Sequence, residues 1–293
     1  MSAKIIDGVQ VAATMREEMK AQIDQLRQAG RPMPGLAVVL VGDNPASVSY
    51  VRGKRKMAAE VGIHSVEHRF PADFTQAQLV QVIAALNEDP AIHGILVQLP
   101  LPAHIDESIL INTIHPDKDV DGLHPINLGR LLRQEEGFLP CTPYGVQQLL
   151  IRSQIPVAGR HVVVVGRSSL VGRPLANILL QKREGANATV TVCHTGTQDL
   201  GYFTRQAEIL VVAAGRPAAI TADMVQAGAV VIDVGVNRVE DATRKQGYRL
   251  VGDVDFAAVK EKASAITPVP GGVGPMTITM LLHNTLWAAQ RQD

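Results

Sequence analysis

Apolar positions along the first hundred residues follow two periods, one typical of helices and one of buried strands. In residues 9–29, apolar side chains recur at helical intervals and Gly30 follows them, which predicts a helix and its end. Short continuous apolar runs alternate with further helical patterns. The predicted strands are 36–41, 65–70 and 94–98, and the further helices are 47–61 and 76–87. This βαβ series predicts a mostly parallel sheet covered by helices.

A second series of the same kind begins after a loop-rich stretch, residues 100–143. It predicts strands at 162–165, 189–193, 209–212 and 230–234, and helices at 144–153, 173–181, 222–227 and 277–291. The change from the first series of strands and helices to the second, near Pro140, predicts a domain boundary. We therefore expect an α/β protein of two α/β domains, the second a Rossmann-like domain with a parallel sheet. The expected ranges are 1–140 together with the C-terminal helix 276–293, and 141–275.

The charge balance narrows the choice of partners. The 293 residues include 28 basic and 28 acidic side chains and no long basic run, which favours a small molecule over nucleic acid. The N-terminus lacks a signal-peptide pattern, and no apolar stretch approaches the ~20 residues that cross a bilayer. We expect a cytoplasmic protein with no membrane partner. Cys141 and Cys193 are expected to be buried thiols, because their surroundings differ and they lack a Cys-x-x-Cys spacing.

Residues 166–174, Gly-Arg-Ser-Ser-Leu-Val-Gly-Arg-Pro, have the outline of a phosphate-binding turn. They follow an apolar strand and precede a helix, so their backbone N–H groups can face a phosphate. Ser168 stands where the middle glycine of Gly-x-Gly-x-x-Gly would be, and an ordinary strand-to-helix turn is the alternative. The next strand ends without the carboxylate that binds the ribose of NAD, whereas Arg167 can pair with an added phosphate and Thr195 can hydrogen-bond it. NADP is therefore favoured.

Candidate catalytic side chains gather in the first series. Ser47, Tyr50 and Lys54 lie three and four residues apart on a predicted helix, and hence on neighbouring positions of one face. The basic residues around Lys54 are expected to lower its pKa towards a value useful in proton transfer, and a solvated basic face is the alternative. Gln98 ends a buried strand, at the edge where open α/β sheets bind ligands.

Two loops complete the candidate site. Residues 119–122, Asp-Val-Asp-Gly, suit a simple Asx turn or a metal site, but the loop shows too few ligands for a metal, and none is expected. Residues 268–277 are too rich in proline and glycine for regular structure. Because loops of this kind carry ligand contacts, this segment indicates a rigid wall beside a bound ring.

These segments occur together, in one order, in a known family. They are residues 50–56 (Tyr-Val-Arg-Gly-Lys-Arg-Lys) with Gly62-Ile63, 94–102 (Gly-Ile-Leu-Val-Gln-Leu-Pro-Leu-Pro), 118–122, 140–143 (Pro-Cys-Thr-Pro), 166–174 and 268–277. By these motifs the chain resembles the bifunctional methylenetetrahydrofolate dehydrogenase/methenyltetrahydrofolate cyclohydrolases, the FolD family, over nearly its whole length. The resemblance implies NADP-dependent oxidation of 5,10-methylenetetrahydrofolate to 5,10-methenyltetrahydrofolate, and hydrolysis of that product to 10-formyltetrahydrofolate. It also implies a homodimer and an active-site cleft between the two domains.

The resemblance implies roles for individual residues. Lys54 would transfer the proton in the cyclohydrolase step, with Gln98 hydrogen-bonded near it. Tyr50 would stack on the aminobenzoyl part of the folate, and Asp121 would bond the pterin edge. The predicted catalytic residues are Lys54, Gln98, Asp121 and Tyr50; the predicted substrate contacts are Tyr50, Ser47, Asp121, Pro270, Gly271 and Gly272; and the predicted NADP contacts are Gly166, Arg167, Ser168, Thr195 and Val236.

Two positions depart from the family pattern. Gly196 stands where many relatives carry a basic residue, and Val236 replaces a commoner isoleucine. Two rival hypotheses are a dehydrogenase of another substrate class, such as a hydroxy acid, and a non-catalytic nucleotide-binding protein. The first leaves Tyr50, Lys54 and Gln98 without a joint role, and the second needs no proton-transfer lysine.

Overall fold

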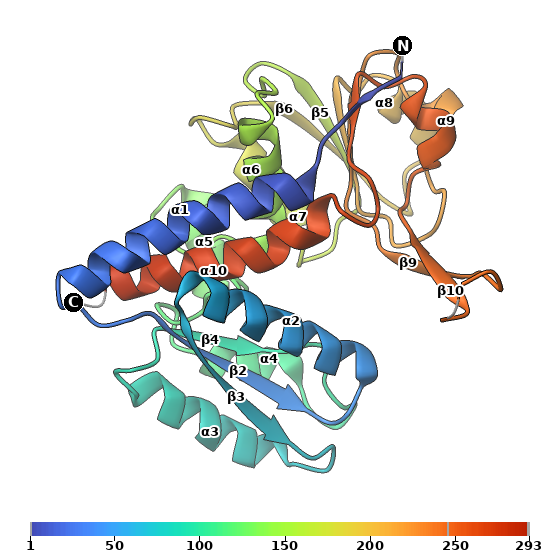
Figure 1. Ribbon diagram of the computed structural model, residues 1–293. Helices are drawn as coiled ribbons and strands as arrows, with labels where there is room; N and C mark the ends of the chain where they lie inside the picture. Colours follow the sequence, from blue (N-terminus) through green and yellow to red (C-terminus); the bar gives the residue numbers. More distant parts are fainter. Residues whose placement is uncertain (1, 245, 292–293) are drawn as a thin grey trace. The chain divides into compact units, whose positions relative to one another are not determined.

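The chain folds into two compact units, which a computed structural model describes for residues 2–244 and 246–291 (Figure 1). The six-stranded unit comprises Met1–Ala12 and Thr142–Thr277, and the three-stranded unit comprises Ala13–Cys141 and Ile278–Asp293. The chain passes from one unit to the other within three helices, α1 (Gly8–Gln28), α6 (Cys141–Arg152) and α10 (Val273–Arg291). Each unit is an α/β structure, as predicted.

The three-stranded unit is built on a parallel sheet of order β3-β2-β4. Its strands are β2 (Gly35–Val41), β3 (His64–Phe70) and β4 (Gly94–Val97). Helices α2 (Pro45–Val61) and α3 (Gln76–Glu88) lie on opposite faces of this sheet (Figure 1). Asn44 caps α2 by accepting the N–H groups of Ala46 and Ser47, and Gly62 ends it in a left-handed conformation with φ 93°. The predicted βαβ series is confirmed here.

The stretch 100–143, which we expected to be rich in loops and for which we predicted no helix, holds two short helices. They are α4 (Glu107–Thr113) and α5 (Pro125–Arg133). Asp106 and His124 cap their first turns through side-chain acceptors, and Pro125 occupies the first helical position of α5. Leu110 and Leu131 are buried, and this burial offsets the poor helix propensity of the surrounding Asn, Thr and Gly residues. The loop prediction was therefore wrong for these residues.

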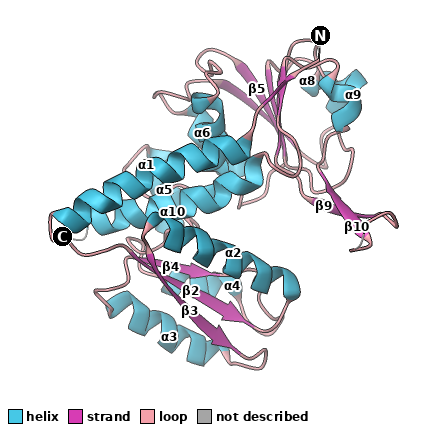
Figure 2. Cartoon of the chain, in the orientation of Figure 1, coloured by secondary structure: helices cyan, strands magenta, loops and turns pink. Residues whose placement is uncertain are grey.

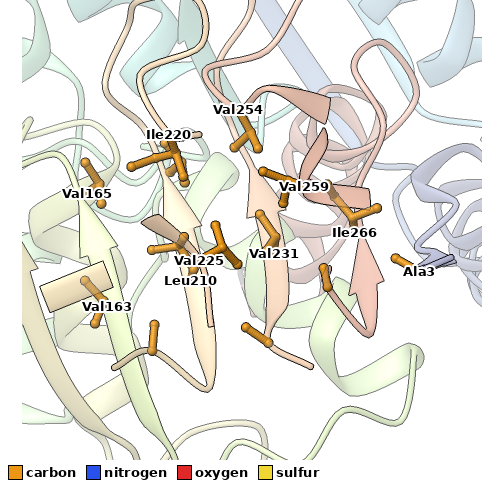
Figure 3. Close-up of a cluster of buried hydrophobic side chains, with 14 of the residues drawn as sticks. Ala3, Val163, Val165, Leu210, Ile220, Val225, Val231, Val254, Val259 and Ile266 are labelled. Carbon is orange, nitrogen blue, oxygen red and sulfur yellow. The ribbon is translucent and has the colours of Figure 1, made fainter. Parts of the chain in front are cut away.

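The six-stranded unit carries a sheet of order β1-β11-β8-β7-β5-β6 in which all the paired strands are parallel. The strands are β1 (Lys4–Ile5), β5 (His161–Val165), β6 (Thr189–Cys193), β7 (Ile209–Val212), β8 (Val230–Asp233) and β11 (Ala265–Ile266). Helices α7 (Gly172–Leu180), α8 (Leu200–Thr204) and α9 (Phe256–Lys260), and the 3-10 turn Ala222–Met224, complete this unit. Figure 3 shows the apolar cluster on this sheet, in which Val163, Leu210 and Val231 come from three strands.

Residues 1–12 differ from the expected domain ranges, because they are part of the six-stranded unit. Strand β1 pairs with β11, and Ala3 donates its N–H to the carbonyl of Lys260 at 2.8 Å. Helix α10 begins at Val273, so the second half of the segment 268–277 is helical rather than irregular as predicted. The antiparallel hairpin of β9 (Asn237–Glu240) and β10 (Tyr248–Val251) was not predicted and forms a sheet of its own (Figure 2).

Candidate active site

Lys54 and Gln98 are joined by a hydrogen bond in the three-stranded unit. The Lys54 Nζ donates to Gln98 Oε1 at 3.0 Å. Lys54 lies on α2, and Gln98 directly follows β4, where Val39 accepts its backbone N–H. The Gln98 amide is oriented by its own Nε2, which donates to the carbonyl of Leu99 at 2.6 Å. The structure therefore brings together the two side chains that the sequence placed on a helix and at a strand end.

Burial lowers the pKa of the Lys54 ammonium below its usual value, and the Asp121 carboxylate partly opposes this by raising the pKa. The lowered pKa confirms the predicted direction. The predicted cause was wrong, since desolvation has the largest effect and the neighbouring basic residues are not among the causes of the shift. Of these residues, Arg55 pairs with Glu67 at 2.7 Å. A lysine with a lowered pKa is neutral more often at neutral pH, so it can accept a proton.

The loop that carries Asp121 is anchored by buried groups on both sides. Asp119, 2% exposed, accepts the N–H groups of Leu123 and His124 and the side-chain amide of Asn127. Ile95 donates its N–H to Lys118 O at 2.8 Å, which holds the loop alongside β4. These bonds keep Asp121 close enough to Lys54 to influence its pKa. Sequence reasoning read 119–122 as a turn and missed the anchoring role of its first carboxylate.

Further anchors come from the C-terminal helix and from Cys141. The amide of Asn284, on α10, donates to the carbonyls of Val120 and Leu139 at 2.9 and 3.1 Å. Cys141 is a free, buried thiol, as predicted, and its Sγ donates to Val120 O at 3.3 Å. Burial raises the pKa of this thiol well above its usual value, so it stays protonated. The Asp121 loop is therefore a rigid platform and not a mobile segment.

The Asp119 carboxyl predicts a pH dependence of stability. Burial raises its pKa from 3.8 to about 6, despite the N–H donors that favour its charged form. Because the folded-state pKa lies above the unfolded one, the stabilising contribution is present below pH 4 and is lost as the pH rises through 6. The loss is about 3 kcal/mol. Between pH 4 and 7 the free energy of unfolding of the wild type should fall relative to that of Asp119→Asn, as measured by urea denaturation. Parallel pH profiles would contradict this assignment.

Tyr50 and Ser47 occupy different environments on α2. Tyr50 is 54% exposed, so its ring is open to a stacking partner. Ser47 is 3% exposed, and its hydroxyl has no hydrogen-bond partner among the residues that the structure describes. All three residues lie on one helix, as the spacing predicted, but Ser47 is buried whereas Tyr50 is exposed. The exposed ring and the lysine lie one turn apart.

The residues Pro270, Gly271 and Gly272 lie in the six-stranded unit, at the start of α10. Gly272 packs against the first residue of α1, because a Cβ on Gly8 would meet Gly272 O at 1.8 Å. Gly271 has φ 105°, a conformation that other residues rarely adopt. The Val269–Pro270 peptide bond is cis. Close packing on one side and an exposed Pro270 on the other fit the predicted rigid loop.

The predicted phosphate turn joins β5 to α7 in the six-stranded unit. A Cβ on Gly172 would lie 2.0 Å from Gly166 O, and a Cβ on Gly166 would lie 2.3 Å from Ala213 O. Both positions therefore require glycine for close backbone packing. The Ser168 hydroxyl accepts the N–H of Val171 at 3.1 Å, and Arg167 and Ser168 are exposed. The N-terminus of α7 thus opens on an accessible turn, which is a suitable place for a phosphate.

The other predicted cofactor contacts, Thr195 and Val236, follow two further strands of the same sheet, β6 and β8. Thr195 is exposed two residues after β6, in a short turn where His194 Nδ1 accepts the N–H of Gly196 at 3.0 Å. Val236 follows β8 and is 52% exposed, which is unusual for valine. The carboxyl ends of β5, β6 and β8 therefore present all five predicted contacts along one edge. No group of described residues forms a cluster that could hold a metal ion.

These features define a class. The parallel sheet with a glycine turn at a helix N-terminus is the architecture of dinucleotide-dependent α/β enzymes, and the second unit adds a lysine suited to acid–base chemistry. Residues 140–293 match the family model "tetrahydrofolate dehydrogenase/cyclohydrolase, NAD(P)-binding domain", and residues 6–121 match the model of the catalytic domain of the same family.

Known proteins are similar over the whole chain. A bifunctional protein FolD of Dehalococcoides mccartyi is 60% identical over 99% of this chain and 98% of its own length. The crystal structure of the bifunctional FolD of Campylobacter jejuni is 47% identical, with a TM-score of 0.93 and full coverage of both chains. The Trypanosoma brucei FolD, solved with NADP cofactor and inhibitor, is 42% identical, with a TM-score of 0.92 over 99% of this chain and 98% of that one.

The chain belongs to the tetrahydrofolate dehydrogenase/cyclohydrolase family. It is a bifunctional enzyme of one-carbon folate metabolism, with a dehydrogenase and a cyclohydrolase activity. Residues 140–293 include its NAD(P)-binding domain. The resemblance inferred from the sequence motifs is confirmed.

Proposed function

We propose that the enzyme oxidises 5,10-methylenetetrahydrofolate with NADP and hydrolyses the methenyl product to 10-formyltetrahydrofolate, with Lys54 as the proton-transfer group. The observation that carries this proposal is the hydrogen bond between Lys54 Nζ and Gln98 Oε1, combined with the lowered pKa of the lysine. In a hydroxy-acid dehydrogenase, the hydrogen-bonded pair Lys54 and Gln98 would have no joint role. Water attacking the methenyl carbon must lose a proton, and a neutral lysine held in place by Gln98 can accept it.

The other folate residues bind and orient. The exposed ring of Tyr50 offers a face for the aminobenzoyl group, and Asp121 offers two acceptor oxygens to paired N–H donors on the pterin edge. Pro270, Gly271 and Gly272 stay predicted substrate contacts, in a loop where Gly271 has φ 105° and Gly272 is closely packed. Ser47 stays a predicted contact only, and its buried hydroxyl would need a side-chain movement to reach a ligand. In the oxidation step, the protein therefore contributes mainly orientation.

The cofactor residues fit a dinucleotide. Gly166 and Gly172 are in close contact across the phosphate turn, and Arg167 and Ser168 between them are exposed. When bound, NADP supplies the hydride acceptor. Arg167 would pair with its 2′-phosphate, and Thr195 would hydrogen-bond the same group. Gly196 supplies no charge there, so Arg167 carries the discrimination between NADP and NAD.

Replacement of Arg167 by alanine should therefore weaken the preference for NADP. Loss of the charge-assisted contacts is expected to lower the ratio of kcat/KM for NADP over that for NAD by about 10- to 100-fold. The matched control is Arg173→Ala, which removes the same charge from an exposed position in the first turn of α7 and should leave the ratio unchanged. An unchanged ratio in Arg167→Ala, or an equal fall in both variants, would contradict the specific role of Arg167.

The function is tested by mixing the purified protein with methylenetetrahydrofolate and either nucleotide, and recording absorbance. We expect the protein to reduce NADP faster than NAD. The methenyltetrahydrofolate that forms should then decay faster than by uncatalysed hydrolysis. Reduction with no accelerated decay would remove the cyclohydrolase assignment. Accelerated decay with no reduction by either nucleotide would remove the dehydrogenase assignment.

The homodimer, which the sequence resemblance implies, and the cytoplasmic location are also proposals. Light scattering of the purified protein should report twice the 31.4 kDa chain mass. Among the described residues, no helix is both long and apolar enough to cross a membrane. We further propose that the folate-binding catalytic domain consists of residues 1–140 with 276–293, apart from the N-terminal residues that pair with the other sheet.

A further inference from the structure

Two buried carboxylates, Asp233 and Asp253, lie behind the carboxyl ends of β7 and β8. Asp233 is the last residue of β8, and Asp253 follows β10. They are 3% and 0% exposed. No role in the reaction was expected for either residue from the sequence. Buried carboxylates are costly unless their oxygens are fully hydrogen-bonded, so the groups that satisfy them show what they hold in place.

Asp253 binds the loops that follow both strands. Its Oδ2 accepts the N–H groups of Ala214 and Gly215, in the loop after β7, at 2.6 and 2.8 Å. Its Oδ1 accepts the side-chain amide of Asn237, in the segment after β8, at 2.8 Å. A Cβ on Gly235 would lie 2.1 Å from the Asp253 carboxyl carbon, so this second loop also packs directly on the carboxylate. One side chain thus holds two loops.

The Asp233 carboxylate in turn fixes the backbone of Asp253. Its Oδ1 accepts the N–H of Asp253 at 3.0 Å, and its Oδ2 accepts the N–H of Val254 at 2.9 Å. A Cβ on Gly252 would lie 1.8 Å from Asp233 Oδ2, so only glycine fits beside this carboxylate. The position of Asp253 is therefore determined by backbone contacts, and its carboxylate is a preorganised acceptor for the loop donors.

The loop after β7 lies next to the phosphate turn, and the loop after β8 follows the next strand of the sheet. Ala213 donates its N–H to Val165 O at 2.7 Å, and its carbonyl is the atom nearest to a Cβ on Gly166. The sheet order β8-β7-β5-β6 places Thr195, after β6, on one side of this turn and both loops on the other. In dinucleotide-binding folds the ribose of the adenosine half binds after the strand on the Thr195 side, so the other half of the dinucleotide extends towards β7 and β8.

We propose that Asp253 is a positioning residue that fixes the loops after β7 and β8 and thereby shapes the subsite for the nicotinamide half of the cofactor. This inference rests on the proposed NADP-dependent function. It assigns Val236 and the segment 213–215 to one subsite that depends on a single carboxylate. Loss of the Asp253 charge would loosen the two loops that shape the nicotinamide subsite. The phosphate turn and the turn that carries Thr195 would stay in place.

The test compares the whole cofactor with its adenosine half. Affinities of Asp253→Asn for NADP and for adenosine 2′,5′-bisphosphate are measured by calorimetry, together with kcat and KM of the dehydrogenase. We expect a loss of NADP affinity of about 10- to 100-fold, and a similar fall in kcat/KM, with the affinity for the bisphosphate unchanged. Asn237→Ala, which removes one donor and spares the carboxylate, should give a smaller loss in the same direction. It also provides a second test if Asp253→Asn does not fold.

The matched control is Asp255→Asn, two residues further on, whose carboxylate caps α9 by accepting the N–H of Ala258 and, among the described residues, accepts no hydrogen bond from Ala214, Gly215 or Asn237. It should bind both ligands like the wild type. Equal losses for NADP and the bisphosphate in Asp253→Asn would show a merely structural role and overturn the proposal. So would unchanged NADP affinity in both Asp253→Asn and Asn237→Ala. A wild-type protein that binds neither ligand would refute the proposed NADP function itself, and this inference with it.

Discussion

Replacement of Lys54 by methionine is expected to lower the cyclohydrolase rate by about 10²- to 10⁴-fold, the range that a positioned acid–base group contributes. Methionine keeps the length of the side chain but cannot accept a proton or donate to Gln98 Oε1. The predicted NADP contacts belong to the six-stranded unit, whereas Lys54 belongs to the three-stranded unit. NADP affinity should therefore be retained. The measurement is the decay of methenyltetrahydrofolate absorbance in the absence of nucleotide.

The matched control for this experiment is Lys56→Met on the same helix. Lys56 is 78% exposed and lies 3.9 Å from Glu60, an ion pair with little energetic weight. Its replacement should leave the hydrolysis rate unchanged. If Lys54→Met hydrolyses methenyltetrahydrofolate as fast as the wild type, the lysine is not the proton-transfer group, and the lowered pKa is only a consequence of its burial.

Replacement of Gly172 by alanine should lower NADP affinity by roughly 10- to 100-fold, because relieving an overpacked contact of this kind costs about 1–3 kcal/mol. The added Cβ would lie 2.0 Å from Gly166 O and 3.0 Å from Arg167 N, both backbone atoms of the phosphate turn. The turn must move for the methyl group to fit. Fluorescence titration of NADP measures the effect, and dehydrogenase activity at low NADP should fall in parallel.

The control for this glycine is Gly129→Ala, where a Cβ would meet no atom within 4 Å. It should leave NADP affinity unchanged. Cyclohydrolase activity measured without nucleotide reports whether Gly172→Ala is folded. A folded Gly172→Ala variant with wild-type NADP affinity would show that this turn does not bind the cofactor.

Most of the helices and strands could be predicted from local sequence patterns. Continuous apolar runs predicted β2, β4, β5 and β7, because a strand that is buried on both faces of its sheet has no solvent-facing position for a polar residue. Helices α4 and α5 escaped prediction since their stability comes from buried contacts and not from propensity. The strands β1 and β11 were missed because two residues are too few to show a period. The hairpin β9–β10 was missed because its strands are only partly buried and therefore contain no continuous buried apolar run.

The candidate site was predicted at the level of residue types. Lys54, Gln98, Tyr50 and Asp121 were found through motifs, and the structure joins the first two by a hydrogen bond. The cause of the lowered Lys54 pKa was not predictable, since desolvation depends on everything that packs around the ammonium group. The burial of Ser47 was not predictable for the same reason, because helical spacing indicates which residues share a face but not where neighbouring elements cover that face.

The sequence by itself determined the family, the two parallel sheets and the glycine turn, because each depends on residues close together along the chain. Only the tertiary structure decided which carboxylates hold the site. Asp119 reaches Asn127 eight residues away, whereas Asp253 reaches Ala214 and Gly215 across almost forty positions. A buried carboxylate must collect its donors from whatever backbone lies beside it in the fold. Such partners follow from packing, which no local pattern contains.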